Sequence, residues 1–135
     1  MKIITCVDDD NGMLFNNRRQ SRDRNVIEKI YEITKGQNLW ITEFSSLLFD
    51  ERATVDEDML EKAEAEDFCF VENLSLLPYK NKIDTLYLFK WNRKYPSDVK
   101  LDFTLDGFDL MRTKYFAGNS HEKITLEVYV NEKNR

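Results

Sequence analysis

The chain has 135 residues, which is enough for one hydrophobic core and too short for two cores of ordinary size, so we expect a single domain over residues 1–135. Hydrophobic residues make up 41% of the chain and charged residues 33%, a balance that excludes an intrinsically disordered protein. The net charge of -5 at pH 7 argues against nucleic acid or an anionic membrane as a partner.

The first predicted element is a strand at Lys2–Val7, where apolar and β-branched residues follow one another without alternation. Such a run is typical of a central strand that is covered on both faces. The run is shorter than the apolar stretch of a signal peptide or a membrane span. Cys6 and Cys69 both lie in apolar runs and are expected to be buried thiols without a disulfide. These features predict a cytoplasmic protein.

A polar loop at residues 8–24 follows this strand, and connections of this length inside a domain are often functional. An amphipathic helix begins near Val26, because apolar residues recur there at helical spacing. Ser21 or Asp23 is available as the N-cap of this helix, and Gly36 marks its C-terminal end.

Strands and helices continue to alternate up to residue 71. A short strand at residues 39–41 leads to a second helix, capped by Thr42, which carries Phe44, Leu47 and Leu48 on one side. A third helix, capped by Asp56, turns Met59, Leu60 and Ala63 inward, and a buried strand follows at residues 68–71. This alternation predicts parallel strands that are joined by right-handed crossovers.

The second half of the chain is rich in strands, at residues 85–91, 109–116 and 123–130. The last two are separated only by the turn-like residues 117–120 and therefore predict a C-terminal antiparallel hairpin. Together, the elements predict an α/β fold with a mixed, mainly parallel sheet, flanking helices and this hairpin.

The order of these elements and three segments of the chain resemble dihydrofolate reductase. The segment DTLYLFKWN is similar to the family's strand before its final hairpin, and GFDLMRTKYFAGNSHEKITLEVYV is similar to that hairpin. The N-terminal KIITCVDDDNGMLFN is similar to the family's first strand and its mobile substrate-covering loop. The resemblance implies the fold of that family over nearly the whole chain.

The cofactor-binding positions of that family carry other residues here. A Gly-Arg-x-Thr segment that holds phosphate in the family corresponds to residues 42–45, where Glu43 brings negative charge. The family's glycines after the strand at residues 68–71 correspond to residues 72–74, which read Glu-Asn-Leu. A further strand of the family, with more cofactor contacts, falls in a gap between residues 49 and 53.

The catalytic positions differ as well. The family's carboxylate at the start of the first helix matches Asn25 or Val26, and its hydroxyl partner matches Phe89. The resemblance therefore implies the scaffold of a reductase that has lost NADPH-dependent reduction, and we assign no catalytic residue and no cofactor. The sequence leaves open an enzyme with a rebuilt site, or a homodimeric interaction module that uses Tyr95-Pro96.

The candidate ligand site is the basic cluster before and at the start of the first helix, which contains Arg18, Arg19, Arg22, Asp23 and Arg24. Guanidinium groups next to a helix N-terminus favour a small anionic ligand such as a phosphate or a carboxylate. The alternative is a solvated basic loop. Asp23 is either the N-cap of the helix or an acid displaced toward the family's pterin pocket.

The sequence predicts no metal site. His121 is the sole histidine, which excludes a zinc centre built from several histidines, and its place beside a hairpin turn predicts a surface position. The consecutive Asp8, Asp9 and Asp10 lack the spaced ligands of a calcium loop and are expected to form a solvated turn.

Overall fold

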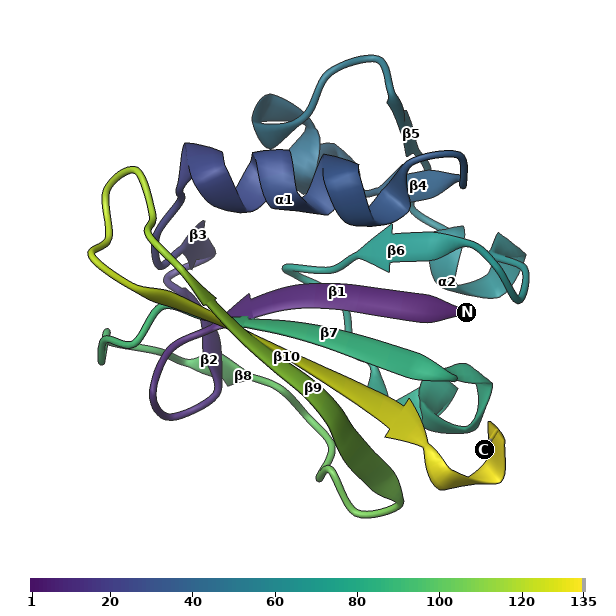
Figure 1. The fold of residues 1–135 in the computed structure, drawn as a ribbon. Helices are drawn as coiled ribbons and strands as arrows, with labels where there is room; N and C mark the ends of the chain where they lie inside the picture. Colours follow the sequence, from purple (N-terminus) through teal and green to yellow (C-terminus); the bar gives the residue numbers. More distant parts are fainter. Residues whose placement is uncertain (135) are drawn as a thin grey trace.

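The computed structural model describes residues 1–134, and its main element is a seven-stranded sheet in the order β5-β4-β6-β1-β7-β10-β9 (Figure 1). Four neighbouring pairs, from β5 to β7, are parallel, and the β7–β10 and β10–β9 pairs are antiparallel. The predicted mixed, mainly parallel sheet with a C-terminal hairpin is therefore confirmed. The strands, in sheet order, are β5 (Ala53–Val55), β4 (Leu39–Ile41), β6 (Phe68–Phe70), β1 (Lys2–Val7), β7 (Thr85–Lys90), β10 (Ile124–Asn131) and β9 (Phe108–Phe116).

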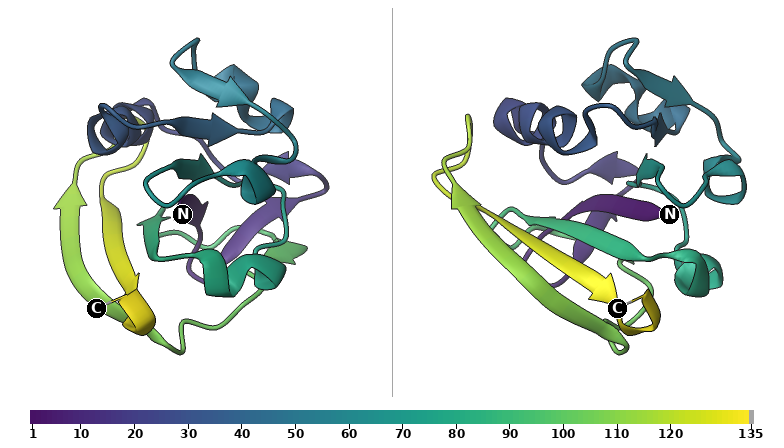
Figure 2. Two further views of the ribbon diagram at one scale, coloured as in Figure 1. Left: turned by 90° about the vertical axis from the view of Figure 1, so that its right-hand side faces the viewer. Right: turned by 45° about the vertical axis from the view of Figure 1, so that its right-hand side comes forward.

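Strand β1 is central and buried on both faces, as predicted. Ile3 and Ile4 are both fully buried, and because their side chains point to opposite faces they belong to different clusters of the core. Helix α1 (Arg24–Thr34) covers the face of Ile4, and α2 (Met59–Lys62) lies on the face of Ile3 (Figure 2). The helices thus lie on both faces of the sheet.

The polar segment at residues 8–24 is not the irregular loop that its composition predicts. It contains β2 (Gly12–Phe15) and β3 (Arg18–Arg19), which form a three-stranded sheet with β8 (Val99–Lys100). Asn16 and Asn17 join β2 to β3 with φ angles of 51° and 60°, the left-handed conformation that a two-residue hairpin turn requires. The strands are too short for an alternation that could reveal them in the sequence.

The second predicted helix is a 3-10 helix, and the third, α2, spans only Met59–Lys62. Residues 43–48 form the 3-10 helix η1 (Glu43–Leu48), in which Leu47 is 85% exposed, so it does not share a buried side with Phe44 and Leu48. Thr42 makes no capping bond, because its hydroxyl donates to the Asn73 side chain at 3.0 Å. Asp56 does not cap α2 either, since its carboxylate accepts from the backbone N–H of residue 58 at 2.8 Å.

Three further segments complete the described chain. The family's further strand, which the sequence comparison placed in a gap between residues 49 and 53, is not missing. It is β5, which begins at Ala53 and runs parallel to β4. Two more 3-10 helices, η2 (Leu77–Lys82) and η3 (Glu132–Asn134), precede β7 and follow β10. In the part of the chain that the structure describes, no helix is both long and apolar enough to cross a bilayer.

Candidate functional site

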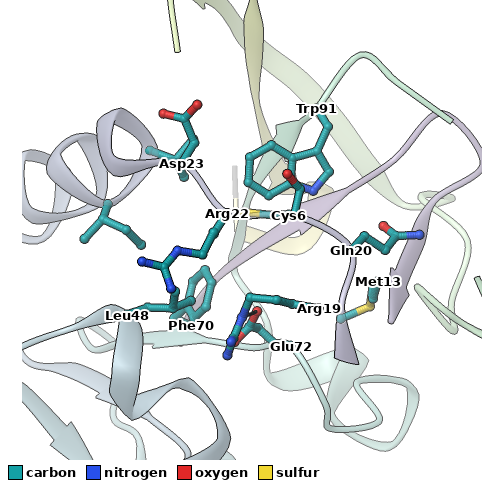
Figure 3. A pocket seen from close by; sticks show the side chains of 13 residues that line it. Cys6, Met13, Arg19, Gln20, Arg22, Asp23, Leu48, Phe70, Glu72 and Trp91 are labelled. Carbon is teal, nitrogen blue, oxygen red and sulfur yellow. Dashed lines mark hydrogen bonds and ion pairs between the residues drawn. The ribbon is translucent and has the colours of Figure 1, made fainter. Parts of the chain in front are cut away.

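A cavity of about 20 Å³ lies at the carboxyl ends of β1 and β6, next to the N-terminal half of α1 (Figure 3). Ligands of open α/β sheets bind at this edge, because the strand-to-helix loops gather there. Its wall is part apolar and part polar. The lining residues are Cys6, Met13, Arg19, Gln20, Ser21, Arg22, Asp23, Val26, Ile27, Leu48, Phe70, Glu72 and Trp91.

The cavity as it stands has room for about one water molecule, so a larger ligand requires a side chain at its wall to move. A more open groove of about 480 Å³ adjoins it and shares Arg19 and Gln20 with it. This groove also contains Arg18 and Tyr95. A ligand that displaces the wall between the two spaces would reach both.

Arg19, one of the predicted site residues, forms an ion pair with Glu72. Its guanidinium makes two parallel bonds to the Glu72 carboxylate, each at 3.0 Å, and a third to the carbonyl of Phe44 at 2.9 Å. Ser45 donates to the same carboxylate at 2.7 Å. Arg19 thus neutralises the acid that follows β6, and it ties the β3 segment to η1.

The other three arginines lie apart from one another. Arg22 is exposed at the cavity, and Figure 3 shows its guanidinium beside Leu48 and Phe70. Arg18 is in the adjoining groove, and Arg24 donates to the Asn119 side chain at 2.9 Å in the β9–β10 turn. The structure therefore brings Arg19 and Arg22 to the cavity and leaves Arg18 and Arg24 outside it.

Asp23 is the N-cap of α1, which is one of the two roles that its sequence position indicates. One carboxylate oxygen accepts from the backbone N–H groups of Asn25 at 2.9 Å and Asn119 at 2.8 Å. The other accepts from the backbone N–H of Ser120 and from Nδ1 of His121, both at 2.9 Å. Figure 3 shows this carboxylate turned away from Arg22.

These donors decide the charge of Asp23. Burial alone raises the pKa of this carboxyl, but the hydrogen bonds from Asn119, His121, Ser120 and Asn25 outweigh burial and hold its pKa well below the usual range. Asp23 is therefore an ionised acid that fastens the β9–β10 turn to the start of α1.

His121 is buried, at 6% exposure, and its predicted surface position is wrong. The turn before β10 folds back onto α1, where Nδ1 of His121 meets Asp23 and the ring stacks on Trp91 with 4.7 Å between centroids. Its Nε2 lies 2.9 Å from the Ser21 hydroxyl and 3.3 Å from that of Tyr95. The local sequence carries no sign of these contacts, because the partners lie 26 to 100 residues away.

The packing of the turn against Asp23 and His121 requires a residue without a side chain at position 118, which is Gly118. A Cβ atom at this position would lie 2.6 Å from the Asp23 carboxylate and 2.7 Å from the backbone oxygen of His121. We expect Gly118→Ala to lower the free energy of unfolding by about 1–3 kcal/mol, because neither neighbour can move without breaking the cap. Urea denaturation followed by circular dichroism measures this loss. Gly36→Ala, which meets no neighbour but has a φ of 83°, separates steric overlap from backbone strain.

Two other groups at the cavity set limits on its chemistry. Burial raises the pKa of the Cys6 thiol well above its usual range, and Glu72 and Asp23 raise it further, so Cys6 stays a neutral thiol. The Gln20 side-chain oxygen is buried without a hydrogen-bond partner in the described structure, while its nitrogen donates to Asp8 and to the carbonyl of Pro96. Gln20, a residue of the cavity wall, thus carries a buried acceptor that no described residue satisfies.

No family model matches the sequence, and none of the curated proteins is similar enough to match it. Solved structures do match, among them dihydrofolate reductase from Enterococcus faecalis complexed with NADP(H) and RAB-propyl. The TM-score is 0.68 at 12% sequence identity, over 96% of this chain and 95% of that chain. The chain therefore has a dihydrofolate reductase-like fold, as the resemblance implied. At this identity the likeness concerns the fold alone.

Proposed function

We propose that this chain is a ligand-binding domain on a dihydrofolate reductase-like fold, and that the cavity beside α1 takes a small organic anion. The observation that carries the proposal is Arg22. Among the ion pairs between described residues, none includes Arg22, although two acids line the same cavity. A guanidinium without a counter-ion at a concave site favours binding of a carboxylate or a phosphate.

The acids of the cavity do not cancel this charge. Glu72 is neutralised by Arg19, and Asp23 accepts from three backbone N–H groups and from His121. Leu48, Phe70 and Trp91 add apolar wall, which suits an aromatic or aliphatic body on the ligand. The buried oxygen of Gln20 would accept from a donor group on that body if the wall moved to expose it.

Reductase activity with NADPH is a weaker alternative, because the residues at the matching positions do not fit a dinucleotide. The Enterococcus faecalis protein is described as complexed with NADP(H). Here the backbone N–H of Glu43, at the start of η1, is already bonded to the Glu57 carboxylate at 2.8 Å. After β6, the side chains of Glu72 and Asn73 bond to η1 and to Thr42, where the family has glycines. Side chains and negative charge at positions where the family has glycines and a phosphate grip disfavour a pyrophosphate, so we propose no cofactor.

Benzoate and phosphate test the proposal through thermal stability. A ligand at ten times its dissociation constant adds about 1.4 kcal/mol of stability, which corresponds to a rise of about 4–6 °C in Tm for a chain of this size. We expect at least one of the two anions to give such a rise, and Arg22→Gln to remove it. The measurement is a melt by circular dichroism at constant ionic strength.

Arg18→Gln is the matched control, because Arg18 is also exposed but lines the groove instead of the cavity. Chloride at the same ionic strength separates specific binding from screening. If chloride stabilises the protein as much as benzoate and phosphate do, or if Arg22→Gln responds like the parent, the anion site does not exist.

A further inference from the structure

Ser21, His121 and Asp23 form a continuous chain of hydrogen bonds at the wall of the cavity. The Ser21 hydroxyl oxygen lies 2.9 Å from Nε2 of His121, and Nδ1 of the same ring lies 2.9 Å from the Asp23 carboxylate. Ser21 lines the cavity and is half-buried, whereas His121 and Asp23 are buried. The serine oxygen is therefore the member of the chain that a bound molecule meets.

The partners of His121 fix its tautomer. Asp23 is ionised and its carboxylate can only accept, so the ring proton belongs on Nδ1. In the neutral ring Nε2 then carries the lone pair, and it faces the hydroxyl of Ser21. Stacking on Trp91, with 22° between the ring planes, holds the imidazole in this orientation. A basic nitrogen aimed at a serine hydroxyl, with an acid behind it, is the arrangement that activates a nucleophile.

We propose that Ser21 is a nucleophile for acyl transfer, with His121 as its general base and Asp23 as the residue that orients this base and stabilises its protonated form. The substrate class is an uncharged or weakly charged carboxylic ester with a small acyl group, because Val26, Leu48 and Phe70 give the cavity an apolar wall that would contact the acyl group once a side chain at this wall moves. This activity goes beyond anion binding, because it does not require Arg22. The neutral thiol of Cys6 is not a competing nucleophile.

The reaction consumes one water molecule for each ester. The Ser21 oxygen bonds to the ester carbonyl carbon as its proton passes to Nε2 of His121, and the carbonyl electron pair moves onto oxygen. When the carbonyl forms again, the bond to the alcohol oxygen breaks, and that oxygen leaves with the proton from Nε2. Water then repeats the two steps on the acyl-serine, releasing the carboxylic acid and restoring the Ser21 hydroxyl.

The Tyr95 hydroxyl also points at Nε2, at 3.3 Å, and it competes with Ser21 for the same lone pair. The longer distance favours the Ser21 contact. Because both hydroxyls share one acceptor, Tyr95→Phe leaves Nε2 to Ser21 alone. An increase in the reactivity of Ser21 in this variant is a consequence that a purely structural hydrogen-bond chain does not have.

A neutral fluorophosphonate ester tests the proposal on the full chain, because it phosphonylates activated serines and bears no charge for Arg22. We expect intact mass spectrometry to find one adduct and peptide mapping to place it on Ser21. Ser21→Ala should abolish the adduct. Ser46→Ala is the matched control, since Ser46 is likewise half-buried but contacts Glu43 instead of a histidine, and it should label like the parent.

Hydrolysis of p-nitrophenyl butyrate gives a second readout. Ser21→Ala should reduce its rate about 100-fold or more, in line with the loss of a nucleophile from such an arrangement. His121→Gln should reduce labelling and hydrolysis alike, and imidazole in solution should restore part of the labelling if the base alone was lost; its circular dichroism melt shows whether the variant is folded. The absence of an adduct, an adduct on another residue, or equal labelling of Ser21→Ala overturns the proposal.

Discussion

Asp23→Asn is expected to lower the free energy of unfolding by about 3–5 kcal/mol, because a buried carboxylate loses at least two hydrogen bonds that are each worth about 1.5–3 kcal/mol when the acceptor is charged. In the parent, the two carboxylate oxygens accept from the backbone of Asn25, Asn119 and Ser120 and from Nδ1 of His121. An amide presents N–H donors to part of this set, so at least two buried donors lose their acceptor. Urea denaturation of parent and variant measures the difference.

Asp9→Asn is the control, because it makes the same chemical change at an exposed aspartate. Its effect should stay within about 0.5 kcal/mol. A loss at Asp23 no larger than this would show that the β9–β10 turn is not fastened through the cap. Since stabilities of small domains are about 5–15 kcal/mol, the expected loss is a large fraction of the total.

Low pH should lower the free energy of unfolding of the parent, because it protonates the Asp23 carboxylate. The hydrogen bonds to Asp23 hold its folded-state pKa well below the ordinary value of 3.8, so the ionised carboxylate contributes stability above that pH. The contribution begins to be lost as the pH falls through 3.8 and continues to be lost toward the lower folded-state pKa. We expect the stability of Asp23→Asn to depend less on pH than that of the parent between about pH 5 and pH 2. Parallel curves for the two proteins over this interval would contradict this.

The parts of the fold that follow from local pattern could be predicted from the sequence. Lys2–Val7 is apolar throughout because the strand is buried on both faces, and the spacing of Val26 and Ile30 reflects the buried side of α1. The parallel sheet follows from the alternation of strands with helices. The hairpin follows from two long strands joined by a short turn.

The candidate site could be predicted only in part, because contacts distant in sequence determine it. Arg19 was expected at an anion site, but its partner Glu72 lies 53 residues away and occupies its guanidinium. His121 meets Asp23 across 98 residues, and no periodicity near the hairpin turn encodes that contact. The short strand β2 pairs with β3 on one side and on the other with β8, which comes from the second half of the chain.

NADPH is expected to bind no tighter than about millimolar, which is about 4 kcal/mol weaker than micromolar binding. The reason lies in the two segments that meet at the carboxyl ends of β4 and β6. Glu43 adds negative charge at the start of η1, and the Glu72 side chain lies between Arg19 and Ser45. A dinucleotide phosphate would have to displace the Arg19–Glu72 ion pair and then lie beside the acid that it releases.

Isothermal titration calorimetry of the parent with NADPH measures this affinity, and Glu72→Gly serves as the comparison. The glycine removes the carboxylate, frees the Arg19 guanidinium and opens the backbone after β6, so any residual affinity for phosphate should rise in this variant. Ser97→Gly introduces a glycine outside the helices and strands without removing a charge, and it therefore controls for a general gain of flexibility. A low-micromolar dissociation constant for the parent would show that Glu43 and Glu72 do not prevent NADPH from binding. NADPH-dependent reduction would then be favoured over anion binding as the function. Weak binding by the parent with tighter binding by Glu72→Gly would identify that single carboxylate as the main electrostatic barrier to the cofactor.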